Sequence, residues 1–222
     1  ISVVHQDHGE CITNITLTNK EVEGWATKLR LIRGRPLDEA NPVLDTSLTL
    51  ANAMARVSAI QPPLSPQGLA FSFRRHRSRP WTFPLFIENK MMNPLAAALM
   101  SFLIDGGRTI LFAGTRSSGK TSLLSAAIVE LMRSTRIITV EDTLELPITK
   151  YQDLNYDIQS MKVQSVITQG EAELTATDGI RTSLRLGDSA LIVGEVRSKE
   201  AVALYEAMRV GALANVVMGT IH

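Results

Sequence analysis

The chain has 222 residues, enough for two domains or one large domain. Hydrophobic residues make up 45% of it and charged residues 20%, as in a soluble globular protein with a sizeable core. The formal net charge of +1 excludes a protein that is basic throughout. The single cysteine, Cys11, excludes an internal disulfide and fits a cytoplasmic chain.

Membrane insertion and secretion are not predicted. No apolar run reaches the ~20 residues that span a bilayer, and no signal peptide is recognisable. Because the sequence starts at Ile1 and stops at His222 within an informative motif, we expect it to be a fragment of a longer protein.

Residues 1–18 alternate weakly between apolar and polar side chains. His5, His8 and Cys11 have a spacing that metal ligands also use, but a fourth ligand is missing. A strand and a turn around Gly9 is therefore the better interpretation.

Residues 20–32 have apolar side chains at helical spacing, and we expect Trp25 to lie in the core. Two strand-like segments, residues 55–60 and 69–74, flank a loop rich in proline and glycine. This pattern predicts a hairpin-like pair in a small α+β domain.

Residues 74–81, with the sequence RRHRSRPW, carry the densest positive charge in the chain. The segment could be a solvated basic loop, or a nucleic-acid patch supported by Trp81 alone. A third interpretation is a source of arginines that reach a nucleotide phosphate, within the chain or across a subunit interface. Residue types alone favour the solvated loop, whereas the motif that follows downstream favours arginines that reach a phosphate.

A phosphate-binding motif lies at residues 114–121, with the sequence GTRSSGKT. An apolar strand-like run at residues 109–113 precedes it, and a helical pattern at residues 122–132 follows it. Glycines in such a loop allow backbone N–H groups to surround phosphate oxygens, next to the positive end of the helix. Lys120 would reach the β- and γ-phosphates, and Thr121 would offer its hydroxyl to magnesium.

Acidic residues follow two further apolar strands. Residues 136–140 lead to Glu141, Asp142 and Glu145, three carboxylates that would repel one another without a cation, water or arginine among them. Residues 190–197 form another apolar strand, with Glu195 near its end. The carboxyl ends of strands are where ligands bind in open α/β sheets, so we expect both groups of acids at the site.

The remaining segments are assigned more coarsely. Residues 161–167 suggest a hairpin or an edge strand, and residues 171–178 are acidic and loop-like. Residues 179–186 predict a helix with Arg181 and Arg185 on one face. Another helix is predicted at residues 199–210 and a last strand at residues 215–218. His222 comes just beyond it, placed to sense the γ-phosphate.

Taken in order, these motifs resemble those of the type II/type IV secretion ATPase family, the hexameric motors of secretion systems, type IV pili and archaella. The similarity covers about residues 50–222, and residues 184–189 and 218–222 are most similar to the archaeal branch. The phosphate loop is generic, whereas residues 141–145, 194–197 and 220–222 together are specific to the family.

The resemblance implies an α/β fold: a RecA-like P-loop NTPase core with a mainly parallel sheet, preceded by a small α+β N-terminal domain. We expect the N-terminal domain at residues 1–88, a linker at 89–94, in which Pro94 opens a helix at 95–104, and the ATPase domain at 95–222. Nucleotide would sit between the domains and be completed by a neighbouring subunit.

The resemblance also assigns residue roles. Glu145 matches the general base, Glu195 the acid near magnesium and the lytic water, and His222 the final histidine of its motif. Arg74 and Arg75, with Arg56 as a weaker candidate, match arginines that approach phosphate. The nucleotide-binding residues carried over are Gly114, Thr115, Arg116, Ser117, Ser118, Gly119, Lys120, Thr121 and Ser122, with Thr121 and Glu195 as magnesium ligands.

Two departures from the family pattern stand out. Gly187-Asp188-Ser189 replaces a frequent Arg-Pro-Asp, and Ala212 replaces an earlier histidine. The second weakens any mechanism that needs two histidines.

The expected activity is Mg²⁺-dependent ATP hydrolysis that powers protein secretion or the assembly of a pilus- or archaellum-like filament. The expected partners are further copies of the chain, in a hexamer, and an integral-membrane platform protein at the inner face of the cell membrane; nucleic acid is not expected. The alternatives are a RecA-like nucleic-acid motor and an assembly module that binds nucleotide without hydrolysis.

Overall fold

The computed structural model describes residues 1–5, 8–33, 36–50, 53–77, 79–115, 117–163, 174–196, 200–210 and 216–221. The chain divides into two compact units. The first comprises Ile1–Thr46 and Val57–Phe73, and the second comprises Ser47–Arg56 and Arg74–His222. The domain limits expected from the sequence remain a prediction.

The first unit begins with a hairpin, in which β1 (Ser2–His5) pairs antiparallel with β2 (Gly9–Ile12). The strand and turn predicted around Gly9 are therefore confirmed. Helix α1 (Asn19–Arg33) follows and buries Ala26 and Leu29. The expectation for Trp25 was wrong: its side chain is 46% exposed and its ring meets Phe73 edge-on, because it lies at the margin of the buried stripe of α1.

A three-stranded sheet has the order β3 (Val43–Leu50), β4 (Ala53–Ile60) and β5 (Ala70–Arg75). The two strands predicted as a pair are thus neighbours. Alternate residues of β4, Ala55, Val57 and Ala59, are buried, as expected for a strand with one face on a core. The ends of these strands that carry Arg56 and Arg74 belong to the second unit.

Two helices precede the central sheet of the second unit. They are α2 (Phe83–Glu88) and α3 (Pro94–Asp105), and each has a proline in its first turn. The side chains of Thr82 and Asn93 cap them by accepting backbone N–H bonds. The predicted opening of α3 at Pro94 is confirmed, whereas α2 is too short to show a helical period in the sequence.

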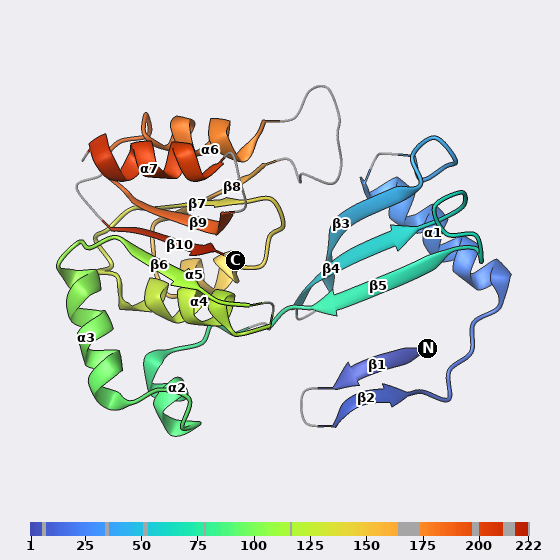
Figure 1. Ribbon diagram of the computed structural model, residues 1–222, viewed down its shortest axis with the longest axis horizontal. Coiled ribbons are helices and arrows are strands. Elements are labelled where there is room, and N and C mark those ends of the chain that lie inside the picture. Colours follow the sequence, from blue (N-terminus) through green and yellow to red (C-terminus); the bar gives the residue numbers. More distant parts are fainter. Residues whose placement is uncertain are drawn as a thin grey trace. The chain divides into compact units, whose positions relative to one another are not determined.

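The central sheet contains five parallel strands in the order β6-β10-β9-β7-β8. Figure 1 shows this arrangement. The α/β class with a mainly parallel sheet is therefore confirmed. Because the strands are parallel, their carboxyl ends meet at one edge of the sheet. The strands are β6 (Ile110–Ala113), β7 (Ile137–Glu141), β8 (Ile158–Lys162), β9 (Ala190–Val196) and β10 (Val217–Ile221).

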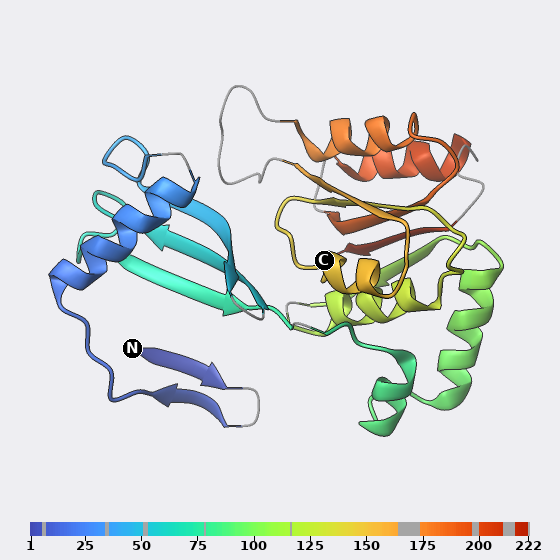
Figure 2. The same ribbon diagram turned by 180° about the vertical axis from the view of Figure 1, so that it is seen from behind.

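Helices cover both faces of this sheet (Figures 1 and 2): α4 (Lys120–Glu130) and α5 (Ile148–Asp153) lie on one face, α6 (Ala176–Ser183) and α7 (Glu200–Val210) on the other. The residues of β9 show why both faces of the sheet are covered. Ala190 and Ile192 pack in the core with α4, and Leu191 and Val193 pack in the core with α6 and α7. A strand buried on both faces is apolar without alternation, as this one is.

The structure corrects one predicted helix. Helix α6 begins at Ala176 and ends at Ser183, because Thr175 and Asp178 form a reciprocal capping box within the segment expected to be a loop. Arg185 follows the C-cap residue Leu184, so Arg181 and Arg185 do not share a helical face. Of the hairpin or edge strand predicted at residues 161–167, only Met161 and Lys162 lie in a strand, as the last two residues of β8 at the edge of the sheet; residues 164–167 lie outside the described residues. In the described part of the chain, no helix has the length and apolar character needed to cross a membrane.

Candidate active site

The phosphate-binding motif joins β6 to α4. Gly119 is the N-cap of α4, with a left-handed φ of 89°, and no side chain caps the helix there. By contrast, Thr82, Asn93 and Thr175 cap α2, α3 and α6. The first N–H groups of α4 therefore lack the side-chain acceptor that those helices have, which leaves them suited to an anion.

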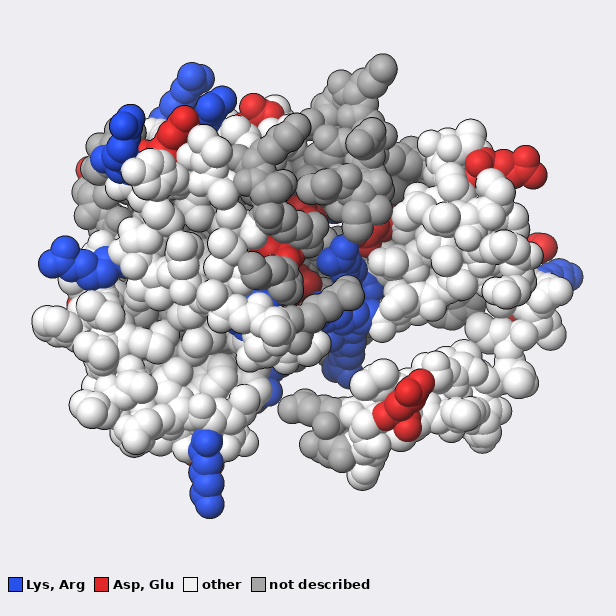
Figure 3. Space-filling model, in the orientation of Figure 1, with Lys and Arg blue, Asp and Glu red and all other residues white. Residues whose placement is uncertain are grey.

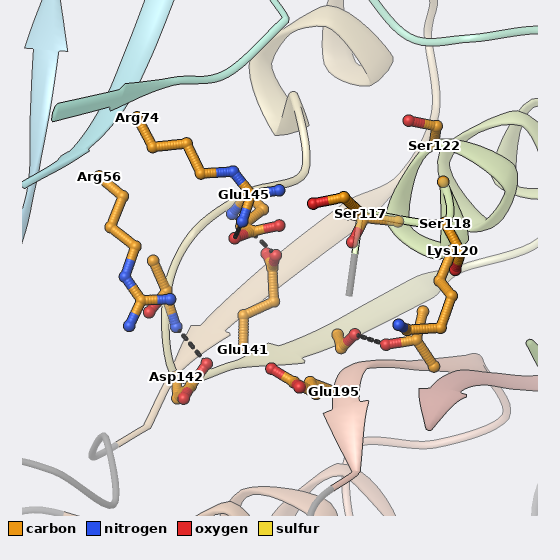
Figure 4. A pocket seen from close by; sticks show the side chains of 15 residues that line it. Arg56, Arg74, Ser117, Ser118, Lys120, Ser122, Glu141, Asp142, Glu145 and Glu195 are labelled. Atoms are coloured by element: carbon orange, nitrogen blue, oxygen red, sulfur yellow. Dashed lines mark hydrogen bonds and ion pairs between the residues drawn. The ribbon is translucent and has the colours of Figure 1, made fainter. Parts of the chain in front are cut away.

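Lys120 is the first residue of α4 and curls back over the loop. Its Nζ donates hydrogen bonds of 2.7 Å to the backbone oxygens of Gly114 and of Thr115. Figure 4 shows its side chain on the loop side of the pocket, opposite the acids. The ammonium is thus held where the phosphate-binding pattern requires a cation.

Three other strands deliver side chains to the same edge of the sheet. Strand β7 ends at Glu141, β9 carries Glu195 close to its end, and β10 carries Thr220. The hydroxyl of Thr220 donates to the backbone oxygen of Gly194 at 2.5 Å, which joins β10 to β9 beside the acids. The loop and these strand ends surround a cavity of about 560 Å³. Its lining is Arg56, Arg74, Ser117, Ser118, Gly119, Lys120, Thr121, Ser122, Glu141, Asp142, Thr143, Glu145, Gly194, Glu195 and Thr220.

Glu141 is the most buried acid of this cavity, with 3% of its surface exposed. Its Oε1 accepts backbone N–H bonds from Glu145 (3.0 Å) and Leu146 (3.1 Å). Burial raises the pKa of Glu141 to about 8, against the lowering effect of these two bonds, and the nearby charge of Glu145 raises it further. The carboxyl is therefore mostly protonated at neutral pH.

The raised pKa of Glu141 predicts a pH-dependent stability. Since the folded state binds this proton more tightly than the unfolded state, the contribution of Glu141 to stability is fully present below pH 4.5 and is lost as pH rises toward 8. Relative to Glu141→Gln, the wild type should lose about 1.4 kcal/mol per pH unit across that window. Urea unfolding of both proteins at pH 5, 6 and 7 measures this. Parallel stability profiles for the two proteins would contradict it.

Two arginines face the acids. The guanidinium of Arg74 lies 3.7 Å from Oε1 of Glu145, and Arg56 points toward Asp142 (Figure 4). Charged side chains of both signs also gather near the centre of the face seen in Figure 3. Arg75 does not line the large cavity. It lines an adjoining cavity of about 140 Å³ that shares Arg74 and Glu145 with the first.

Three further residues of the basic segment have partners within the protein. The guanidinium of Arg77 stacks over the ring of Trp81 at 4.3 Å, and that ring also packs on Phe86 at 4.8 Å. His76 is buried, and its backbone N–H donates to the oxygen of Met54; burial lowers the pKa of His76, against the raising effect of Glu145. Trp81, which alone supported a nucleic-acid patch, therefore has protein partners.

A buried pair of hydroxyls connects the loop helix to the acid-bearing segment. The hydroxyl oxygens of Tyr151 on α5 and Ser125 on α4 are 2.7 Å apart, and the hydroxyl of Tyr151 also lies within hydrogen-bonding distance (3.0 Å) of the backbone oxygen of Ser125. Tyr151 is fully buried, and burial raises its pKa. Helix α5 begins just after Glu145, so this contact fixes the acid-bearing turn relative to α4.

Most of the residues expected at the site are brought together. The large cavity collects Arg74, Lys120, Thr121, Glu145 and Glu195, together with the serines of the loop. Arg116 and His222 lie outside the described residues. Glu141 and Asp142, which the sequence placed at the site without a role of their own, also line the cavity, and the structure adds Thr220.

A magnesium ion suits the oxygen donors of this cavity, which include the hydroxyl of Thr121 and the carboxylate of Glu195. Within the described residues, no group of three or more His, Cys, Asp or Glu side chains is arranged to hold a metal ion. The residues present therefore fit a cation that takes its other ligands from phosphate and water, as Mg²⁺ commonly does.

Comparison with known proteins shows the family to which the chain belongs. The sequence model of a family described as type II/IV secretion system protein matches residues 20–222. The chain belongs to this family. Among its relatives, MJ0781 of Methanocaldococcus jannaschii is 32% identical over 95% of the chain and 29% of its own length. The conjugal transfer protein TrbB of Rhizobium radiobacter is 28% identical over 83% of the chain and 53% of its own length.

A solved structure, that of the Legionella pneumophila ATPase DotB, matches 95% of this chain and 56% of its own, with a TM-score of 0.62 and 20% identity. This likeness shows that the chain shares the fold of DotB. The chain spans about a third to just over half of the length of these curated relatives.

Proposed function

We propose that this protein is the ATP-hydrolysing subunit of a secretion or filament-assembly motor. The observation that carries the proposal is that the uncapped start of α4, Lys120, Arg74 and four acids meet in one cavity. Anion-binding groups and carboxylates in one cavity suit the transfer of a phosphoryl group to water.

In this reaction, a water oxygen attacks the γ-phosphorus in line, and the bond from that phosphorus to the β–γ bridging oxygen breaks. Glu145 accepts the proton of the attacking water. Lys120 and the N–H groups of α4 hold the phosphates, and Arg74 moves from Glu145 toward the charge that develops on the γ-phosphate. A bound magnesium ion, held by Thr121 and Glu195, would neutralise negative charge on the phosphates.

The family suggests what this reaction drives. Relatives are described as conjugal transfer and type IV secretion proteins, which points to export of macromolecules. The proposed working form is a hexamer that acts on an integral-membrane platform protein at the inner face of the cell membrane, and a filament of the pilus or archaellum type is the other candidate load. The final histidine, His222, would complete the site as a sensor of the γ-phosphate.

Phosphate release from ATP by the purified protein tests the proposal. Hydrolysis should require Mg²⁺: EDTA should reduce it to background, and excess Mg²⁺ should restore it. Single-stranded DNA or RNA should leave the rate unchanged. Tight nucleotide binding without any phosphate release would favour an assembly module instead, and a rate that rises steeply with nucleic acid would favour a nucleic-acid motor.

A further inference from the structure

Glu141 touches both of the segments that present acids to the cavity. Its carboxyl bonds to the turn that carries Glu145, and its side-chain stem packs against Gly194, the residue before Glu195. Figure 4 shows Glu141 directed toward Glu145 and lying above Glu195.

The first contact determines where the side chain of Glu145 begins. Oε1 of Glu141 accepts the N–H groups of Glu145 and Leu146, at 3.0 and 3.1 Å. These two bonds close the turn after β7 and fix its backbone. Since the contact is made to the backbone, it acts whatever the side chain at position 145 does.

The second contact determines the approach of β9. A Cβ added to Gly194 would lie 2.9 Å from Cγ of Glu141 and 3.5 Å from its Cβ, so a side chain at 194 would displace Glu141. The hydroxyl of Thr220 holds Gly194 from the other side through its backbone oxygen. Glu195 is therefore placed by a strand end that is packed directly on Glu141.

The environment of the other carboxyl oxygen of Glu141 also indicates a functional role for this residue. Oε2 is buried and has no hydrogen-bond partner among the described residues. A buried polar atom without a partner is costly, and such atoms need a functional or structural reason. An apolar residue would fill the space without this cost, but it would leave the two N–H groups of the turn without an acceptor.

We propose that Glu141 is a positioning residue that sets the geometry between Glu145 and Glu195. This inference rests on the proposed hydrolysis of ATP, in which Glu145 accepts the proton and Glu195 serves the cation. Glu141 acts through the turn and through Gly194, and takes no part in the proton transfer itself.

Two substitutions of Glu141 separate the hydrogen bonds of its carboxyl group from the packing of its side-chain stem. Glu141→Gln keeps both the stem and an oxygen acceptor, so its kcat should stay within about threefold of the wild type. Glu141→Met keeps the stem and removes the acceptor, and misplacement of the acid should lower kcat by about 100-fold. Because neither change touches the phosphate loop, KM and the affinity for a fluorescent ATP analogue should remain unchanged in both.

A Gly194→Ala variant tests the packing contact in a double-mutant cycle. Alone it should lower kcat, because its methyl group displaces Glu141. Combined with Glu141→Ala, it should add no further loss, since the crowded atoms are gone. Gly24→Ala, at a helical glycine with no atom within 4 Å of the added Cβ, is the matched control and should behave as wild type.

Crystal structures of Glu141→Met and Glu141→Gln decide the inference without reference to activity. The Glu145 carboxylate should leave Arg74 in the Met variant and stay beside it in the Gln variant. An unmoved Glu145, or a kcat of the Met variant equal to that of the Gln variant, would overturn the role of Glu141. A wild type that hydrolyses no ATP would overturn the proposed function instead, and the two structures would still decide the positioning role.

Discussion

Glu145→Gln should lower the kcat of ATP hydrolysis by about 100- to 10,000-fold, the range expected when a general base is removed. The amide keeps the size of the side chain but accepts no proton from the attacking water. Since Glu145 does not belong to the phosphate loop, KM for ATP should change by less than about threefold. Phosphate release under saturating Mg–ATP measures the first quantity, and a titration with ATP measures the second.

The matched control is Glu206→Gln on α7. Glu206 pairs with Arg181 at 3.5 Å, and both side chains are largely exposed, so the loss of this ion pair should be nearly silent. If Glu145→Gln hydrolysed ATP as fast as this control, Glu145 would not be the base, and Glu195 would become the candidate.

Lys120→Ala should affect binding and hydrolysis together. In the proposed reaction, the ammonium stabilises charge on the transferred phosphoryl group, and the loss of such a group commonly costs about 100- to 1,000-fold in kcat. It also bridges the backbone oxygens of Gly114 and Thr115, so its removal loosens the loop before nucleotide binds. We therefore expect a lower affinity for a fluorescent ATP analogue, in contrast to Glu145→Gln.

Lys150→Ala provides the comparison for this variant. Lys150 lies on α5 and pairs with Asp153 at 2.8 Å on the surface, and its loss should leave hydrolysis and affinity unchanged. Full nucleotide affinity in Lys120→Ala would show that the phosphates bind elsewhere in the protein.

The resemblance to the secretion ATPase family was enough to predict the mainly parallel sheet, and the acids that follow its strands indicated the edge at which the candidate site lies. Parallel strands place their carboxyl ends together, so Lys120, Glu145 and Glu195 could be assigned to one place without coordinates. The opening of α3 was predictable for a similar reason, since Pro94 is a local signal that does not depend on distant residues.

The features that sequence could not predict depend on contacts between distant segments. The exposure of Trp25 depends on which part of the α1 surface is covered, and a helical period does not specify that. The place of Glu141 depends on Gly194, some fifty residues further along the chain, which allows the close approach of the two strands. A local signal was also overlooked: Thr175 and Asp178 have the spacing of a capping box, which marks the true start of α6.

The buried hydroxyl contact between Tyr151 and Ser125 has a consequence for the energetics of binding. It ties α5 to the helix that follows the phosphate loop, so the turn that carries Glu145 is ordered when the chain folds. Preorganised groups lose little conformational entropy when a ligand arrives. In the proposed motor, nucleotide binding would therefore not need to assemble these two elements, and more of its free energy would remain available for work on the load.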